Sequence, residues 1–310
     1  MNTGLLKKAL ANSTVSPFRE LLDYEYLYSI HGMTLKKISE ITVGAGKLPS
    51  AALDSMGGLL DPRETAEYAE VASYVRGKLG TFDIAVRGTS TWPDSLADSE
   101  RPAPILYYRG DLNLMNVPSV SVVGSRKASS DGLALAAKVA GDLVSMGYHV
   151  ATGLAAGVDT AAATSALEAK GGSVIGVIGK PIDECYPKGS EGLHAAVYGT
   201  GGLLVSQVPF YRYSVQPFPS KKYYFPERNE LMAAISDATF IVEASDTSGT
   251  LSQARACAHQ GRPLFISRHC WEDPSVRWPR QWADRENVWV VSCAEEAVEM
   301  LEGGLLRGAL

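Results

Sequence analysis

The sequence predicts an α/β protein, in which a doubly wound, mostly parallel, Rossmann-like sheet follows a small helical N-terminal module. Short apolar segments and amphipathic segments alternate from residue 119 to residue 301, as in successive βαβ units. Before Phe82 the apolar residues recur at helical spacing instead. We therefore predict two domains, a helical module over 1–78 and an extended Rossmann-like domain over 79–310.

The N-terminal module is predicted to consist of short helices. Apolar residues recur at roughly helical spacing within residues 5–10, 21–30 and 35–38. In the segment Asp61-Pro62-Arg63-Glu64 an N-cap residue precedes a proline at the first helical position, which predicts a helix continuing through Val75. Polar residues do not cluster in this part of the sequence, so it predicts no chemistry for the module.

The second domain is predicted to be built from strands that alternate with helices. Two early strands, Phe82–Val86 and Ile105–Tyr108, are followed by strands at 119–123, 148–152, 173–178, 202–206, 239–243, 263–267 and 288–291. The predicted helices cover 131–146, 157–170, 190–198, 228–236, 249–260 and 294–301. Ligands bind such sheets beyond the carboxyl ends of the strands. The site is therefore expected in the loops at 124–130, 152–159, 179–187, 206–229 and 243–250.

Composition excludes several classes of protein. The chain has 310 residues, 45% of them hydrophobic, which excludes a mainly disordered state. The longest apolar runs, such as 173–179, are far shorter than the ~18 residues of a membrane span, and a signal-peptide stretch is absent from the N-terminus. We expect a cytoplasmic protein with no membrane partner. With 29 Lys and Arg against 34 Asp and Glu the net charge is −5, which argues against coating nucleic acid by bulk charge but permits a local basic pocket.

Metal sites and ATP hydrolysis are not expected. The four cysteines are widely spread, without the paired spacing of a zinc site or a disulfide framework, and should be reduced. The histidines show no pair at metal-binding helical spacing, and a Walker motif is absent. The sequence predicts no cofactor.

The loop after the strand at 119–123 contains residues suited to phosphate. Gly124 permits a sharp turn, Ser125 and Ser129 offer hydroxyl groups, and the helix that follows presents free N–H groups to an anion. Arg126 can supply a planar, bidentate phosphate contact. The alternative is an ordinary strand-to-helix turn with a solvated arginine.

Two further strand-to-helix loops repeat this pattern. In the second loop Gly153 and Gly157 bracket a helix start, and Asp159 in its first turn is as consistent with a structural role as with ligand binding. The third loop follows Glu243 and contains Ser248, Gly249 and Thr250. Three such loops on one sheet edge predict an anion site.

The long loop before residue 229 mixes cations with aromatic residues. Arg212, Lys221, Lys222 and Arg228 alternate there with Phe218, Tyr223, Tyr224 and Phe225. This mixture suits single-stranded nucleic acid, because bases stack on aromatic rings and cations neutralise phosphates. In the alternative, the aromatic residues at 223–225 fill the core beneath the loop. Lys222 and Arg228 are expected as exposed charges beside the glycine-containing loops.

These motifs, in this order, resemble those of the DNA-processing protein family DprA, also called Smf. They are Val-Gly-Ser-Arg at 123–126, Gly-Leu-Ala-Ala-Gly-Val-Asp at 153–159, Tyr186-Pro187, Phe-Pro-Glu-Arg-Asn at 225–229 and Ser-Gly-Thr-Leu at 248–251. The stretch from Trp92 to Asp111 is similar to that family's entry into its Rossmann-like domain. The resemblance runs from about residue 82 to residue 301.

The resemblance implies a single-stranded DNA-binding protein of natural transformation, usually a homodimer, that protects incoming DNA and loads a RecA-type recombinase. It also implies a positive pocket at the carboxyl edge of the sheet that holds phosphates and a base, with no catalytic residues. The positions carried over are Arg126, Phe225, Arg228 and Asn229, with Lys221 and Lys222 just before the aromatic residue.

Four positions depart from the family pattern, and three of them lower the predicted affinity. Ala156 replaces a basic residue, Ala163 a histidine, Gln207 a glutamate and Glu230 a second arginine. Loss of cations removes phosphate partners, and Glu230 adds repulsion. We expect weaker DNA binding than in typical members, or a smaller ligand.

The sequence also permits two other functions. The third loop also resembles that of phosphoribohydrolases, but Gln253 stands where those enzymes have a glutamate, and an amide cannot act as general base. Glu243 and Asp246 lie nearby, so this alternative stays open. The runner-up is a nucleotide-sensing Rossmann protein of a DNA-defence or signalling system.

The tryptophans at 271, 278, 282 and 289 either cover the last strand or contribute to a dimer contact.

Overall fold

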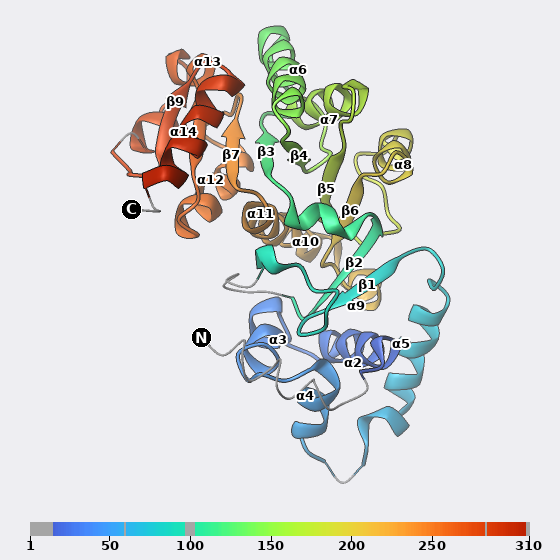
Figure 1. The fold of residues 1–310 in the computed structure, drawn as a ribbon. Helices are drawn as coiled ribbons and strands as arrows, with labels where there is room; N and C mark the ends of the chain where they lie inside the picture. The colour runs from blue at the N-terminus through green and yellow to red at the C-terminus, as the bar shows by residue number, and fades with distance from the viewer. Residues whose placement is uncertain (1–14, 59, 97–102, 283, 308–310) are drawn as a thin grey trace. The chain divides into compact units, whose positions relative to one another are not determined.

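The computed structural model describes residues 15–58, 60–96, 103–282 and 284–307 (Figure 1). The predicted helical segment at 5–10 lies outside the described residues. Contacts divide the chain into two compact units. Unit 1 comprises the described residues up to Arg109 together with Gly179–Glu184 and Val205–Tyr224, and unit 2 comprises Gly110–Ile178, Cys185–Leu204 and the described residues from Phe225 onward. The predicted boundary at 78 falls inside unit 1.

The described residues form a nine-stranded sheet with the order β1-β2-β6-β5-β4-β3-β7-β8-β9. The strands are β1 Asp83–Val86, β2 Ile105–Gly110, β3 Ser119–Val123, β4 His149–Thr152, β5 Val174–Ile178, β6 Leu203–Ser206, β7 Ala238–Ile241, β8 Leu264–Ser267 and β9 Val288–Val291. Each lies within about two residues of its predicted bounds, because buried strands are read directly from short apolar runs. The predicted α/β, Rossmann-like fold class is confirmed.

Unit 2 contains the parallel part of the sheet, in which β5, β4, β3, β7, β8 and β9 are neighbours in that order. The chain proceeds from β3 to β4 and β5 on one side, and later returns to β7 and continues outward on the other side. The strand order therefore reverses between β3 and β7. In doubly wound sheets this point is where the loops diverge and a ligand can bind.

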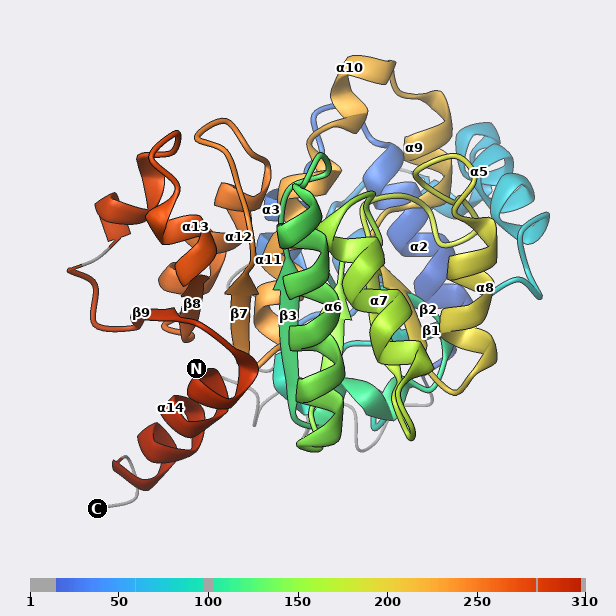
Figure 2. The ribbon, with the colours of Figure 1, turned by 90° about the horizontal axis from the view of Figure 1, so that it is seen from above.

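Helices cover both faces of the sheet in unit 2. Figure 2 shows α6 (Ser130–Ser145) and α7 (Val158–Glu168) on one face, and α11 (Tyr224–Ile235) and α12 (Thr250–His259) on the other. The remaining helices are α8 (Glu191–Gly199), α13 (Arg268–Glu272) and α14 (Ala294–Arg307). α11 begins four residues before its predicted start at 228. Pro226 lies in the first turn of α11, where proline is accommodated because the first N–H groups of a helix have no partner within it.

The sequence of α6 explains its position. Ser129 caps its start by accepting a hydrogen bond from Gly132 N. The buried residues Ala136, Val139, Ala140 and Leu143 recur at helical spacing and face β3 and β4. This fixes the first helical turn, and with it the loop after β3, at the carboxyl edge of the sheet.

Unit 1 is a helical cluster joined by an antiparallel strand pair, β1 and β2. Its helices are α2 (Pro17–Ser29), α3 (Leu35–Ile41), α4 (Pro49–Ser55), α5 (Ala66–Arg76), α9 (Phe210–Val215) and α10 (Phe218–Lys221). α2 buries Leu21, Tyr24 and Leu27 and packs against α4 and α5, as Figure 1 shows. No helix in the described ranges is both long and apolar enough to cross a membrane.

The helix predicted from Asp61 through Val75 is interrupted. Asp61 caps only a short 3-10 turn, Pro62–Glu64, by accepting a hydrogen bond from Arg63 N (3.0 Å). Thr65 is extended and caps α5 separately, since its hydroxyl accepts from Tyr68 N (3.2 Å). Two capping residues in succession gave the appearance of one helix start.

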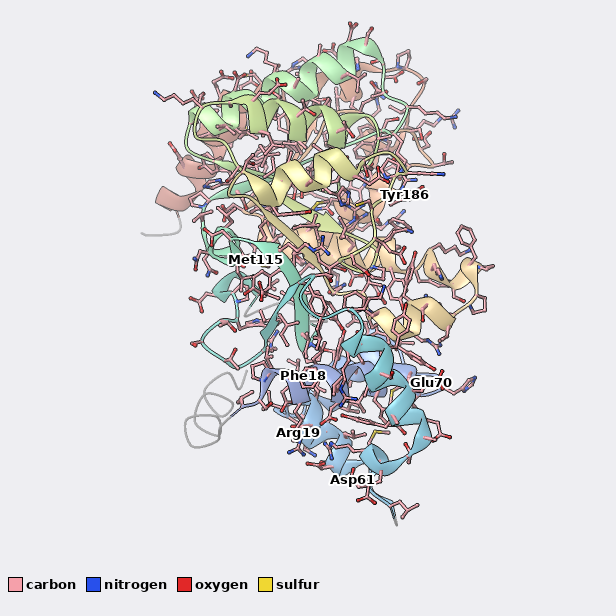
Figure 3. All side chains as sticks on the ribbon, turned by 90° about the vertical axis from the view of Figure 1, so that its right-hand side faces the viewer. Phe18, Arg19, Asp61, Glu70, Met115 and Tyr186 are labelled. Carbon is pink, nitrogen blue, oxygen red and sulfur yellow. The ribbon has the colours of Figure 1, made fainter. Side chains whose placement is uncertain are left out.

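The expectation that polar residues do not cluster in the helical module was wrong. The carboxylate of Asp23 is fully buried and accepts hydrogen bonds from Arg63 Nη2 (2.7 Å) and the Tyr68 hydroxyl (2.7 Å). Arg63 Nη1 also contacts Asp54 (2.7 Å), and these carboxylates raise the arginine pKa. Arg19 and Asp61, labelled in Figure 3, complete the network. Its members are up to 45 residues apart in sequence, so local patterns could not predict it.

A second buried carboxylate in unit 1 fixes the start of α9. Glu25 accepts hydrogen bonds from the Tyr107 hydroxyl (2.6 Å), Phe210 N (2.9 Å) and Tyr211 N (3.0 Å). Burial outweighs these bonds and raises the pKa of Glu25 to about 7. The carboxyl group thus attaches the segment that contains α9 and α10 to α2.

Candidate functional site

The loops after β3, β4 and β7 are joined by hydrogen bonds at the carboxyl edge of the sheet in unit 2. Ser125 N donates to Glu243 O (2.6 Å), and Val158 N donates to Ser125 O (3.2 Å). The Thr250 hydroxyl donates to Gly124 O (3.1 Å). The three glycine-containing loops predicted from the sequence therefore form one cluster at the point where the strand order reverses.

Two glycines permit this close approach. Gly157 has φ +81°, and a Cβ on it would overlap the carbonyl oxygen of Ser125. A Cβ on Gly124 would lie 2.7 Å from Cγ2 of Val158 and 2.8 Å from Glu243 O. Both positions therefore require glycine for backbone packing, whether or not the loops bind a ligand.

The start of α6 is occupied by a carboxylate from this chain. Ser129 N lies 3.2 Å from each carboxylate oxygen of Glu243, and the Ser129 hydroxyl donates to Oε2 (2.7 Å). His269 Nε2 lies 3.2 Å from the same oxygen. The predicted free anion position at this helix start is thus filled by Glu243, which complements the helix dipole as a bound phosphate would.

Arg228 is buried, so the expectation that it is an exposed charge was wrong. Its Nη1 donates to Val177 O (3.0 Å), and its guanidinium lies against Gly153. Burial lowers the pKa of Arg228, while the negative charge of Asp159 acts in the opposite direction. Nε of Arg228 has no hydrogen-bond partner among the described residues.

Asp159 stabilises the loop after β4. Its Oδ2 accepts hydrogen bonds from Gly153 N (3.1 Å) and Ala155 N (3.4 Å). Burial raises the pKa of Asp159, against the opposing effects of Arg228 and these N–H groups. This is the structural role that the sequence left open for Asp159.

Arg126 is exposed and lies against two aromatic rings. Its guanidinium carbon is 5.5 Å from the centroid of the Tyr186 ring and 5.8 Å from that of Phe225. Its Nη1 donates to the Tyr186 hydroxyl (3.3 Å), and the two rings are 5.8 Å apart. Tyr186 is partly exposed and projects from the loop before α8 (Figure 3). A planar cation beside two accessible rings can contact a phosphate and a base together.

The remaining polar residues of the third loop bind one another. Asn229 Nδ2 donates to the Ser252 hydroxyl (2.6 Å) and approaches Gly249 O (3.4 Å). Thr250 N donates to the Ser248 hydroxyl (3.1 Å). Asn229 is buried, and its contacts with the start of α12 hold α11 and α12 together on the same face of the sheet.

The carboxylate and amide groups considered for a hydrolase serve the fold. Gln253 is buried, and both ends of its amide are satisfied when the nitrogen faces Asn229 O (2.8 Å) and the oxygen accepts from the Thr239 hydroxyl (3.1 Å). Asp246 accepts from Arg277 N (2.8 Å) and Trp278 N (2.9 Å), and these bonds lower its pKa. Glu243 caps α6. All three therefore take part in contacts that stabilise the fold.

Lys221 and Lys222 belong to unit 1. Lys221 Nζ lies 4.3 Å from the centroid of the Tyr213 ring, and Lys222 Nζ lies 5.5 Å from that of Tyr223. Both lysines pair with aromatic rings within residues 210–224, which we call the α9–α10 segment. The structure does not assign them to the cluster in unit 2.

The electrostatic balance of the cluster is nearly even. Arg126 and Arg228 supply positive charge, whereas Asp159 and Glu243 supply negative charge within hydrogen-bond distance of the same loops. Ala156, at one of the positions that lost a cation, is exposed. Among the described residues, no group of three or more His, Cys, Asp or Glu side chains is arranged to hold a metal ion.

Sequence reasoning missed two contributors to the site. Tyr186 was noted only within a Tyr-Pro motif, and Glu243 only as a nearby carboxylate. Tyr186 lies in a loop at the carboxyl edge of the sheet, and an aromatic residue in such a loop could have been predicted to belong to the site. The capping role of Glu243 had no local signal, because Ser129 is 114 residues away in the sequence.

Comparison with known proteins identifies relatives of the part of the chain that contains the cluster. The family model described as "DNA recombination-mediator protein A" matches residues 83–302, which include every residue of the cluster. Protein Smf of Escherichia coli is 32% identical over 213 residues, covering 69% of this chain and 54% of that protein. DNA processing protein DprA of Streptococcus pneumoniae is 34% identical over 174 residues, covering 56% of this chain and 58% of the relative. The chain thus spans little more than half the length of these relatives.

Two solved structures share the fold. The crystal structure of DNA processing protein A from Streptococcus pneumoniae has a TM-score of 0.72 and 24% identity, covering 92% of this chain and 98% of that one. DNA processing protein A from Helicobacter pylori, described by its single-stranded DNA binding mode, has a TM-score of 0.59 and 22% identity. That match covers 72% of this chain and 97% of the other.

Proposed function

Because the chain belongs to the DNA recombination-mediator protein A family, we propose that it binds single-stranded DNA at the carboxyl edge of the sheet in unit 2. The observation that carries the proposal is the position of Arg126 against the rings of Tyr186 and Phe225. Single strands expose both faces of their bases, so accessible rings beside a cation suit them better than a duplex.

Each group has a distinct part in this proposal. Arg126 neutralises a phosphate, and its planar guanidinium keeps the two rings in place. A base that stacks on Tyr186 or Phe225 contributes about 1–3 kcal/mol and needs no particular sequence. Arg228 is buried, so its role is to position the loop after β4 through Gly153 and Val177.

The carboxylates predict weak, salt-sensitive binding. Glu243 and Asp159 lower the positive potential of the loops that would meet the phosphates. The affinity for DNA then depends on a few solvent-exposed contacts between cations and phosphates. Counterions screen these contacts, so the affinity falls as the salt concentration rises. The net charge of −5 for the whole chain acts in the same direction.

The family also suggests a biological role. We infer a DNA-processing role in natural transformation, in which the protein, as a homodimer, protects incoming single strands and delivers them to a RecA-type recombinase. The family's description as recombination mediators supports this role. The placement of Gln253, Glu243 and Asp246 in structural contacts supports a binding protein rather than an enzyme.

The test compares Arg126→Ala and Arg126→Lys with the unaltered protein. Binding of a labelled oligonucleotide is measured by fluorescence anisotropy at several salt concentrations. Arg126→Ala should lower affinity by about tenfold and reduce the slope of log K against log salt by about 0.7, the value for one phosphate on a single strand. Arg126→Lys should keep the slope but lose part of the affinity, because an ammonium group lacks the planar contact with the rings.

Lys170→Ala is the matched control. It removes one positive charge just after the C-terminus of α7, at the opposite edge of the sheet, and should leave both affinity and slope unchanged. Unchanged binding in Arg126→Ala would contradict the proposed site. Duplex DNA and free nucleotides are titrated in parallel, and a preference for free nucleotide would support the sensor instead.

A further inference from the structure

We propose that the α9–α10 segment of unit 1 is a second stacking surface for the bound single strand, with Phe218 and Tyr223 as the groups that receive bases. This inference rests on the proposed function, since it assigns a second contact to the same ligand. It concerns residues that the cluster in unit 2 does not contain.

The exposure of the two rings is the first observation. Phe218 is 85% exposed, more than any other large apolar side chain that the structure describes, and Tyr223 is 63% exposed. Exposing a large ring to water costs free energy that burial would recover, about 25 cal/mol for each Å² of apolar surface. Two such rings within six residues form a concentrated apolar feature on the surface of unit 1.

The backbone that carries these rings is nevertheless well packed. Tyr224 is 6% exposed and forms a buried cluster with Tyr213 and Val208. The rings of Tyr213 and Tyr224 are 5.7 Å apart. Glu25 also fixes the start of α9. The segment thus presents Phe218 and Tyr223 from a fixed support, which lowers the entropy lost when a base stacks on them.

The charge of the segment favours a polyanion. Residues 208–226 contain Arg212, Lys221 and Lys222 but no Asp or Glu, although the whole chain has more acidic than basic residues. Lys222 lies over the Tyr223 ring, so a cation accompanies an exposed ring directly. The cores of protein–protein interfaces are depleted of lysine, whereas single-strand binding surfaces combine cations with aromatic rings. Nucleic acid is therefore favoured over a second copy of this chain.

Chain connectivity limits the distance between Tyr223 and Phe225. Tyr223 is two residues before Phe225, so their Cα atoms are at most about 7.6 Å apart, whatever the arrangement of the two units. A strand that stacks on Phe225 can therefore reach Tyr223 within a short distance. The second surface would hold the nucleotides adjacent to those at Arg126 and Phe225.

The experiment uses oligonucleotide length to separate the two surfaces. Thymidine dinucleotides and oligothymidylates of about twenty nucleotides are titrated against the full chain and against Phe218→Ala and Tyr223→Ala. Each substitution should weaken binding of the long strand by about fivefold or more and leave the short strand nearly unchanged, because a short strand occupies only the unit 2 site. Tyr223→Phe and Phe218→Trp should retain long-strand affinity, since both keep a ring.

Val215→Ala is the matched control, because Val215 is 55% exposed in the same segment but has no aromatic face. It should bind both strands as the unaltered protein does. Suppose that Arg126→Ala weakens binding while Phe218→Ala and Tyr223→Ala leave binding of the long strand unchanged. In that case the second surface does not bind DNA, and the proposed function stands. If Arg126→Ala also has no effect, the proposed function itself fails. A changed sedimentation coefficient in the ring variants, with DNA binding intact, would overturn the inference in favour of a contact between copies.

Discussion

The guanidinium group of Arg228 occupies the space that a side chain on Gly153 would fill. A Cβ built on Gly153 would overlap Nη1 of Arg228, which is buried and donates to Val177 O (3.0 Å). A positively charged group is thus packed against the end of β4 because residue 153 has no side chain. The two residues are 75 positions apart, yet neither position can be changed independently.

We predict that Gly153→Ala destabilises the protein. The methyl group must displace the guanidinium from Val177 O or shift the loop after β4, and overpacking of this kind costs about 1–3 kcal/mol. The free energy of unfolding, measured with urea, should fall by that amount. Gly192→Ala is the control, because a Cβ at this position of α8 meets no atom within 4 Å and alanine favours the helix. Equal stability of Gly153→Ala and the unaltered protein would contradict the packing of Arg228.

Glu243→Gln should lower the stability of the protein and raise its affinity for single-stranded DNA. The amide keeps one oxygen acceptor for Ser129 but loses the second, so the free energy of unfolding should fall by about 1 kcal/mol. The loss of one negative charge near Arg126 should raise affinity for single-stranded DNA by about twofold at low salt. Anisotropy titrations at low and high salt check this, since the gain should disappear when the charge is screened. Glu168→Gln, an equal charge change at the far end of α7, should show no gain.

The sheet could be predicted from the sequence because its strands are short apolar runs between turns. β3 and β9 have the predicted bounds, and the strand order explains why three glycine-containing loops converge. The contacts that decide each residue's role were not predictable. The burial of Arg228 depends on Gly153, and the capping of α6 depends on Glu243, both far away in the sequence. Local patterns report which residues can bind an anion, whereas distant contacts decide which remain available for one.

The stability of unit 1 should depend on pH through Glu25. Burial raises the pKa of this carboxyl group from 4.5 to about 7 in the folded protein. Between these values the folded state keeps a proton that the unfolded state has released, so the free energy of unfolding falls as pH rises. The contribution is complete below pH 4.5 and is lost above pH 7, and it is at most about 3 kcal/mol. Urea unfolding at a series of pH values between 4.5 and 8 measures it.

Two variants distinguish Glu25 from other carboxylates. Glu25→Gln cannot titrate and should flatten the decline in stability over this pH range. Glu70→Gln changes an exposed carboxylate on α5 that accepts from the Tyr211 hydroxyl (2.8 Å), and it should retain the decline. A decline of the same size in Glu25→Gln would show that another group is responsible.

The adjacent residues Tyr223 and Tyr224 show why a run of aromatic residues could not be interpreted from sequence alone. The sequence allowed this run either to bind a single strand or to fill the core, and in the structure one neighbour is buried while the other is exposed. Tyr224 is buried against Tyr213, whereas Tyr223 is largely exposed beside Lys222. Consecutive side chains at a helix start point in different directions, so one can be buried while the next stays in water.

We therefore predict opposite effects for the two tyrosines. Tyr224→Ala leaves a cavity in the cluster with Tyr213 and Val208 and should lower the free energy of unfolding by about 3 kcal/mol or more. Tyr223→Ala removes an exposed ring and should change it by less than about 0.5 kcal/mol. Urea unfolding of both variants measures this contrast, and Tyr224→Phe, which keeps the ring, should be close to the unaltered protein. Similar losses in Tyr223→Ala and Tyr224→Ala would mean that both rings are buried, and the exposed stacking surface would then not exist.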